Sequence, residues 1–241
     1  MVMTMLLRLR VELPDRPGSL GQVARTLGVA GADIVQVLVL ERVSGRAVDD
    51  FTVVWPASAA VDRILAGLTA VPGVRVAGVW RSTELPERGG REVAVVGQVA
   101  ANPARGLVTL VDAVPGLFAA DWAVVGTVGV DWADGGGAGV RVVCGSCRAP
   151  GVPLIPDLTP LRPRAVTGAD GAHLAAAPFH RAGLVLVVAR GGDPDAEAGL
   201  HAPPFHRGEV ERLAQLVDAA GTVLGTRVDE PARGLVSERA A

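Results

Sequence analysis

The stretch LPDRPGSLGQVARTLGVAGADIV, residues 13–35, decides the fold at the start of this chain. It closes a run of alternating apolar residues and then turns sharply through Asp15-Arg16-Pro17-Gly18. Apolar residues follow at helical spacing, namely Leu20, Val23, Ala24 and Leu27. Such a turn between a strand and a helix leaves backbone amides uncovered at the helix N-terminus, where a small anion can bind.

The residues around this stretch extend the pattern. Apolar and charged residues alternate strictly over residues 7–13, which predicts a strand with one buried face. A second strand is predicted over Ile34–Leu40 and a third over Ala47–Trp55, joined by a hairpin turn at Ser44-Gly45.

A second helix and a last strand complete the first domain. Ser58 is the predicted N-cap of a helix whose apolar stripe is Val61, Ile64, Leu65 and Leu68. Pro72-Gly73 then leads into a strand over Val74–Trp80. The order βαββαβ within residues 1–82 is the split βαβ arrangement of the ferredoxin-like fold, with both helices on one face of the sheet.

A second α+β domain is expected after a polar linker at residues 83–91. It covers residues 92–227, is built around an antiparallel sheet, and is followed by a flexible tail at residues 228–241. Its predicted elements are a helix over Arg105–Val114, strands over Asp121–Val130 and Val140–Gly145 around a Gly135–Gly137 turn, a proline-rich loop over Arg148–Pro163, apolar runs over Ala172–Phe179 and Gly183–Arg190 joined by a His180-Arg181 turn, and a helix over Arg207–Leu224.

Composition excludes several classes of protein. The net charge of −2 over 241 residues gives no basic surface of the kind that nucleic acid requires. No apolar run is long enough to span a membrane, and two cysteines build no disulfide framework. We therefore expect a cytoplasmic protein without nucleic-acid or membrane partners. Every basic residue is arginine, which is typical of GC-rich bacterial genes.

The turn predicts a site for a zwitterion. The amides of Gly18, Ser19 and Leu20 are expected to be free donors for a carboxylate. Asp15 precedes them and Asp33 begins the next strand, so either carboxylate could meet an ammonium group. Two such charges about one carbon apart describe an α-amino acid. The alternative is that Asp15 caps its own backbone and Gly18 only satisfies the turn.

Residues 6–82 resemble an ACT domain, a regulatory module of amino-acid metabolism. The resemblance rests on DRPGSLGQVARTLGVAGADIVQV, residues 15–37. The motif positions that match are Asp15, Pro17, Gly18, Leu20 and Asp33. The resemblance to an ACT domain implies that two domains join side by side into an eight-stranded sheet. It also implies that the ligand binds between the turn of one subunit and the second strand of the other.

The resemblance also implies a set of ligand-binding residues, namely Leu13, Asp15, Pro17, Gly18, Ser19, Leu20, Asp33 and Ile34. One departure from the family is the acid at Asp33, where amino-acid binders often carry asparagine. No cofactor is expected at this site. The resemblance allows a homodimer or a tetramer.

Residues 92–226 resemble a GAF domain. The likeness rests on LAAAPFHRAGLVLVVARG at residues 174–191, on PPFHRGEVERLAQLVDAAGTVLG at residues 203–225, and on the strand region DWAVVGTVGVDWADG at residues 121–135. GAF domains bind small molecules or serve only to dimerise. The residues do not choose between these roles.

Cys144 and Cys147 form a CxxC pair. The pair could close a disulfide as a thiol switch, or join two of the histidines His173, His180, His201 and His206 in a zinc site. The spacing is not that of a zinc finger, so small strand-end residues are the simpler interpretation. No catalytic motif is recognisable.

These observations favour a non-enzymatic, dimeric regulatory sensor that binds an amino acid or a similar small ligand. Its output would pass through a separate effector protein. The alternatives are a regulatory subunit of an amino-acid biosynthetic enzyme, a redox or metal sensor that uses the CxxC pair, and an enzyme of unrecognised type.

Overall fold

The computed structural model describes residues 3–82, 90–128, 140–180, 183–191 and 199–225. These form two compact units. The first contains Met1–Pro86 and Asp193–Pro203, and the second contains Glu87–Gly192 and Pro204–Ala241. Both are α+β, and their two sheets are antiparallel, which confirms the predicted fold class.

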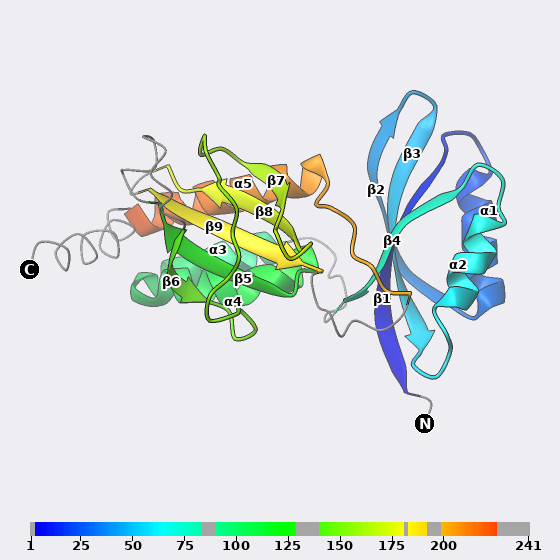
Figure 1. Cartoon of the computed structure of the whole chain (residues 1–241), viewed down its shortest axis with the longest axis horizontal. Coiled ribbons are helices and arrows are strands. Elements are labelled where there is room, and N and C mark those ends of the chain that lie inside the picture. Colours follow the sequence, from blue (N-terminus) through cyan, green and yellow to red (C-terminus); the bar gives the residue numbers. More distant parts are fainter. Residues whose placement is uncertain (1–2, 83–89, 129–139, 181–182, 192–198, 226–241) are drawn as a thin grey trace, which may run out of the picture. The chain divides into compact units, whose positions relative to one another are not determined.

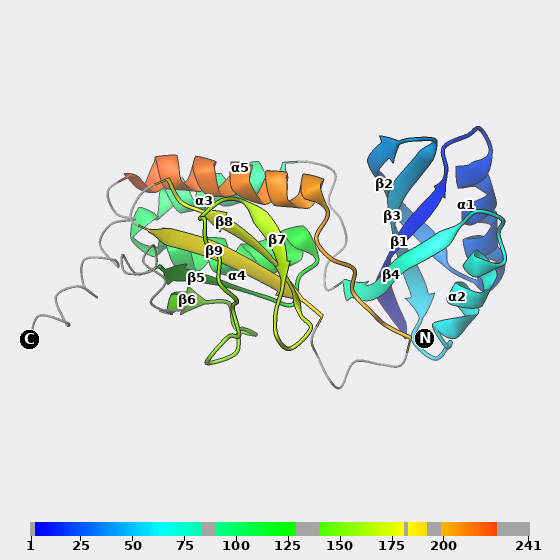
Figure 2. The same ribbon diagram turned by 45° about the horizontal axis from the view of Figure 1, so that its top comes forward.

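The first unit has the predicted βαββαβ order. Its elements are β1 (Thr4–Pro14), α1 (Ser19–Ala30), β2 (Asp33–Val43), β3 (Arg46–Pro56), α2 (Asp62–Thr69) and β4 (Arg75–Ser82). The sheet order is β2-β3-β1-β4, so β2 and β4 are the edge strands. Helices α1 and α2 lie side by side on one face of this sheet (Figure 1, Figure 2).

The core of the first unit lies between this sheet and its two helices. The buried residues alternate along β1 and β3, and they meet one side of each helix. From the strands come Leu7, Leu9, Val11, Leu13, Ala47, Phe51, Val53 and Trp55, and from the helices Val23, Leu27, Ala30, Ile64 and Leu68. The hairpin between β2 and β3 turns at Ser44 and Gly45, whose φ angles are 51° and 75°. Positive φ at both positions is typical of two-residue hairpin turns, which match the right-handed twist of the flanking strands.

Two sequence predictions for these helices are wrong in detail. Ser58 does not cap α2, because the chain first makes a turn in which Ala59 donates its amide to the Pro56 carbonyl; the N-cap is Val61. Leu20 does not belong to the buried stripe of α1. It is 42 % exposed, and Ser19 occupies the buried position instead.

The second unit contains helices α3 (Arg91–Ala101), α4 (Gly106–Phe118) and α5 (Arg207–Leu224), and a 3₁₀ turn over Pro103–Arg105. Its strands are β5 (Trp122–Thr127), β6 (Arg141–Gly145), β7 (Arg164–Thr167), β8 (His173–Pro178) and β9 (Leu184–Arg190), in the order β6-β5-β9-β8-β7. Helix α5 has the predicted limits. The prediction did not include α3 or the four-residue β7, and the predicted Gly135–Gly137 turn, the Arg181 half of the His180-Arg181 turn and the tail lie outside the described residues.

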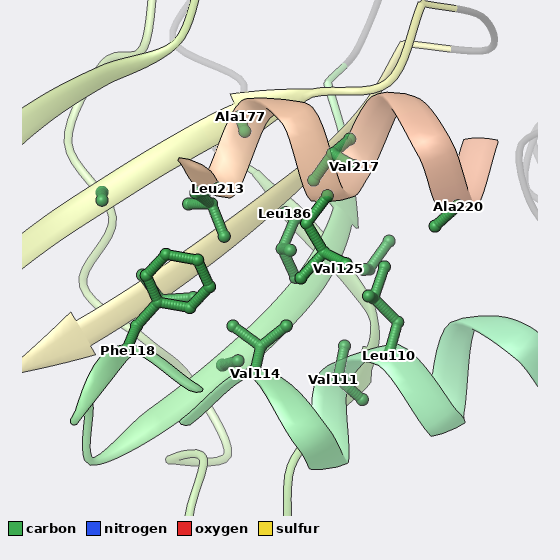
Figure 3. Packing of buried hydrophobic residues seen from close by; sticks show 14 of the residues in the cluster. Leu110, Val111, Val114, Phe118, Val125, Ala177, Leu186, Leu213, Val217 and Ala220 are labelled. Carbon is green, nitrogen blue, oxygen red and sulfur yellow. The ribbon is translucent and has the colours of Figure 1, made fainter. Parts of the chain in front are cut away.

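Helices α4 and α5 of the second unit pack on the sheet, and α3 packs against both of these helices. Figure 3 shows α4 and α5 directing apolar side chains toward one another and toward the strands. The labelled residues are Leu110, Val111, Val114, Phe118, Val125, Ala177, Leu186, Leu213, Val217 and Ala220. Helix α3 adds Val95 and Val99 to this cluster, so a short valine-rich helix is held by tertiary packing.

A short segment far along the chain belongs to the first unit. His201 bridges to Val79 of β4 through two backbone hydrogen bonds, of 2.7 Å from the His201 amide and 2.9 Å from the Val79 amide. Leu200 packs against the core of the first unit, and Pro203 lies so close to Gly78 that a Cβ there would come within 2.6 Å of it. The sequence-based division had placed these residues in the second domain.

Candidate functional site

The turn between β1 and α1 leaves the backbone of Gly18 exposed. Gly18 is the N-cap of α1 and adopts φ 90° and ψ −18°, in the left-handed region that favours glycine. A Cβ placed on Gly18 would meet no atom within 4 Å, so the space beside the turn is open. Pro17 is exposed in the same turn. The turn therefore presents bare backbone at the start of a 12-residue helix.

The amides at this helix end are only partly free. Ser19 donates its amide to the Arg16 carbonyl at 3.2 Å, so the prediction that all three amides are free is wrong for Ser19. Within the described residues the amides of Gly18 and Leu20 have no hydrogen-bond acceptor. They remain the donors that an anionic group could reach.

Asp15 is paired with an arginine that the sequence analysis did not identify. Arg42 of β2 holds the Asp15 carboxylate in a bidentate contact, with Nη2 at 2.6 Å and Nε at 3.0 Å from Oδ1. The hydrogen bond to Asp15 and its charge raise the pKa of Arg42. Within the described residues the Asp15 carboxylate is thus bound by Arg42 and accepts no backbone amide.

The two halves of the predicted site lie at opposite ends of the first sheet. Arg42 is opposite Ala47, beside the turn, whereas Asp33 is opposite Val54 at the other end of β2. Nine residues of strand separate them, which is on the order of 30 Å. Within one chain, the turn residues and the Asp33–Ile34 pair therefore do not meet.

The remaining predicted site residues have different surroundings. Leu13 is 2 % exposed and its side chain belongs to the core, so it is not available for contact with a ligand. Ile34 is half-buried against the same core, while Asp33 is exposed. Leu20 is partly exposed beside the turn, where it leaves an apolar surface next to the free amides.

Strand β2 carries an apolar surface on an open sheet edge. It is the outermost strand beside β3, and five of its hydrophobic residues are exposed, namely Val35, Val37, Leu38, Val39 and Val43. Edge strands with exposed apolar side chains readily add another strand.

Asp49 of β3 is the second residue that the sequence analysis missed. It occupies a core position in the alternation of Ala47, Phe51 and Val53, and it is 3 % exposed. Its Oδ1 has no hydrogen-bond partner, and the hydroxyl of buried Ser19 has none either. Asp49 could have been noticed in the sequence, because it alternates with apolar residues that face the core, and an acid is unusual at such a position.

The CxxC pair of the second unit consists of two free cysteines. Cys144 is half-buried in β6 and Cys147 is exposed. Burial raises the pKa of the Cys144 thiol, which disfavours the reactive thiolate. No group of three metal-ligating side chains occurs within the part of the chain that the structure describes. His206 instead caps α5, where its Nδ1 accepts the Gly208 amide.

The sheet face of the second unit that lies away from its helices is also packed. The loop after β6 places Leu158 against Val124, Leu174 and Val187, and Leu158 is 1 % exposed. The Arg164 guanidinium donates to the Thr159 carbonyl at 2.9 Å and ties the loop to β7. In this structure the loop, with Leu158 at its centre, covers that face.

Comparison with known proteins gives little further information. No protein-family model matches the chain, and no curated protein matches it. Among solved structures, a formyltetrahydrofolate deformylase from Pseudomonas putida KT2440 is similar at 15 % identity and a TM-score of 0.29, over 40 % of this chain and 38 % of that one. An unknown protein from Galdieria sulphuraria is similar at 12 % identity and a TM-score of 0.31, over 78 % of this chain and 81 % of that one. TM-scores this low carry no argument about function. Among the helices of the described residues, none has the length and apolar character to cross a membrane.

Proposed function

We propose that this chain is a regulatory ligand sensor of the ACT type, which binds an amino acid or a similar small zwitterion at the turn before α1 and performs no catalysis itself. The observation that carries the proposal is the left-handed Gly18, which leaves open space and two acceptor-free amides at the N-terminus of α1. The motif residues Asp15, Pro17 and Gly18 occur at this turn, in the βαββαβ order of that family.

The site is completed by a second copy of the chain. Asp33 lies at one end of β2 and the Asp15–Arg42 pair at the other, so a two-fold pairing of β2 with β2 of a partner subunit would bring opposite ends together. The exposed apolar residues of β2 supply the surface for such pairing. The homodimer thereby forms two equivalent sites, each from the turn of one subunit and the start of β2 of the other.

The second unit is proposed to act as the GAF-like response module. Ligand bound across the seam favours one arrangement of the two subunits and so shifts the population seen by a downstream partner. That partner is a separate effector protein or an enzyme. A regulatory subunit of a biosynthetic enzyme is one form of the same output.

A thermal-shift screen of the twenty amino acids tests the binding proposal. A ligand at 100 times its dissociation constant adds about 2.7 kcal/mol to the free energy of unfolding, which is a visible shift. Gly18→Val should abolish the shift, because valine fills the open space and strains a positive φ. Gly31→Val is the matched control: Gly31 ends the same helix at φ 95° with equally open space, so its variant suffers the same strain and should keep the ligand response. No shift of the wild type with any amino acid would contradict the proposal.

The dimer is tested at the middle of β2. Leu38 is the central residue of Asp33–Val43, so two copies would meet near the two-fold axis. Leu38→Lys places like charges against each other and should raise the dimer dissociation constant by at least about tenfold, as measured by sedimentation equilibrium. Val29→Lys, on an exposed site of α1, is the control and should leave the dimer intact. Equal dissociation of both variants, or a monomeric wild type, would count against pairing through β2.

A further inference from the structure

The Asp49 carboxylate is buried, and one of its oxygens, Oδ1, has no hydrogen-bond partner. Asp49 lies opposite Val11 of β1 and Val39 of β2, so its immediate neighbours across both strand pairs are apolar. Its Oδ1 is buried and accepts no hydrogen bond. Burial is the largest cause of a raised pKa at Asp49, and the nearby charges of Asp50 and Asp15 raise it further.

Such a residue destabilises the unliganded fold. A polar group removed from water without a compensating hydrogen bond lowers stability, and a charged group lowers it more. An asparagine or a small apolar residue would pack at this position with a smaller penalty. An acid in this place is explained when its missing partner is a group that the chain does not itself supply.

The position of Asp49 relates it to the turn. Helix α1 packs on the face of the sheet that Asp49 shares, because buried Val23 and Leu27 of α1 belong to one core cluster with Ala47 and Phe51, the residues two before and two after Asp49 on β3. Asp49 is paired with Val11, three residues before the end of β1, and α1 begins five residues after β1 ends. Ser19, the first buried residue of α1, faces the same layer with an unpartnered hydroxyl. The two partnerless buried oxygens therefore lie at the same end of the helix–sheet layer.

Asp15, Arg42 and Asp49 together leave one negative charge over. Asp15 and Arg42 neutralise each other through their bidentate contact. Arg42 also acts on Asp49 through its charge and lowers the pKa of that carboxyl, which opposes the effect of burial, but it makes no hydrogen bond to it. The missing partner is thus a small cation with hydrogen-bond donors.

We propose that Asp49 is the residue that recognises the cationic amine of the ligand, while the free amides of Gly18 and Leu20 receive its anionic group. The assignment rests on the proposed function. It differs in the residue that binds the amine, which is Asp49 on β3 in place of Asp15 or Asp33. It restricts the ligand class to small molecules with a free ammonium group, because an ammonium offers three donors to Asp49 and the Ser19 hydroxyl. An N-acylated amino acid lacks that charge and is rejected.

The test compares Asp49→Asn with the wild type in thermal-shift and calorimetric titrations against the twenty amino acids, their N-acetyl derivatives and simple primary amines. Asp112→Asn, an exposed acid on α4 of the second unit, is the control for the change of charge. We expect one or more free amino acids to bind the wild type and the control, no N-acetyl derivative to bind, and Asp49→Asn to raise the dissociation constant by roughly 10- to 100-fold. The same variant should be at least as stable as the wild type without ligand, a combination that a purely structural residue would not give.

Each other outcome is decisive. If an amino acid binds Asp49→Asn as tightly as the wild type, or its N-acetyl derivative binds equally well, Asp49 is not the amine receptor, although the sensor function stands. If neither amino acids nor amines bind the wild type, the sensor function and the role of Asp49 both fail.

Discussion

The two faces of the first sheet carry neighbouring acids with opposite surroundings. Asp50 points away from the helices and is 2 % exposed, and Arg10 holds it at 2.7 Å and 2.8 Å. Arg8 adds a third contact at 3.2 Å, and both guanidinium groups lie over the Trp80 ring. Asp49, one residue earlier on the helix-covered face, is equally buried, and its Oδ1 has no hydrogen-bond partner. Burial alone therefore does not reveal the role of a charge; the difference lies in whether the fold supplies a partner.

The largest effect in this comparison is expected from Asp50→Asn. It removes the carboxylate that holds the buried Arg10 guanidinium, and breaking one side of a buried pair lowers the free energy of unfolding by about 3–5 kcal/mol. This loss is measured from the unfolding transition of the first unit in urea. A loss below about 1 kcal/mol would mean that the contacts of Asp50 contribute little to stability. The contrast between Asp50, which has arginine partners, and Asp49 would then have no energetic basis.

A smaller effect of opposite sign is expected from Asp49→Asn. Because the pKa of Asp49 is raised in the folded state, the fold binds that proton more tightly than the unfolded chain does. Its contribution is favourable below the unfolded pKa, about 3.9, and is lost as the pH rises through the higher folded value. Asparagine carries no such charge, so the variant should gain about 1–2 kcal/mol at pH 7 relative to wild type.

The pH dependence is the check on that gain. The stability difference between Asp49→Asn and the wild type, from urea unfolding at pH 4, 5, 6 and 7, should grow with pH. A difference that is constant over this range, or that shrinks toward pH 7, would mean that Asp49 is ionised without penalty.

The smallest effect is expected from Asp15→Asn. The Asp15–Arg42 pair is exposed, with 66 % of the arginine side chain accessible, and exposed ion pairs contribute little to stability. Unfolding in low and high salt should show a small loss that salt screens further. A loss as large as that of Asp50→Asn would mean that Asp15, like Asp50, is needed for stability. The comparison would then not distinguish an acid with a functional role from one with a structural role.

Much of this fold could be predicted from the sequence, because the signals are local. The alternation over residues 7–13 and the apolar spacing over Arg207–Leu224 each specify an element without reference to the rest of the chain. Helix α3 was missed because its valines are poor helix formers, and its formation depends on packing against α4 and α5.

The candidate site was only partly predictable, for a different reason. Gly18 and its turn are encoded within six residues, so the positive φ could be anticipated. The contact of Arg42 with Asp15 requires Ala47 to pair with both Arg42 and Leu13. The first pairing follows from the Ser44-Gly45 hairpin, but the second joins strands that are not consecutive, and no local signal sets that register. The distance between Asp33 and the turn has the same origin.

The Val79–His201 bridge has a consequence for how this chain can be cut. Since residues 193–203 complete the first unit, the polypeptide passes between the two units three times, and neither unit is a continuous fragment. A peptide ending at residue 86 would lack Leu200 and His201, and it would leave β4 with an open edge. A single protease nick between residues 86 and 87 should therefore give two pieces that stay associated in native buffer and separate only in denaturant. Fragment complementation, in which a peptide of residues 193–206 restores a truncated first unit, is the natural way to dissect this protein.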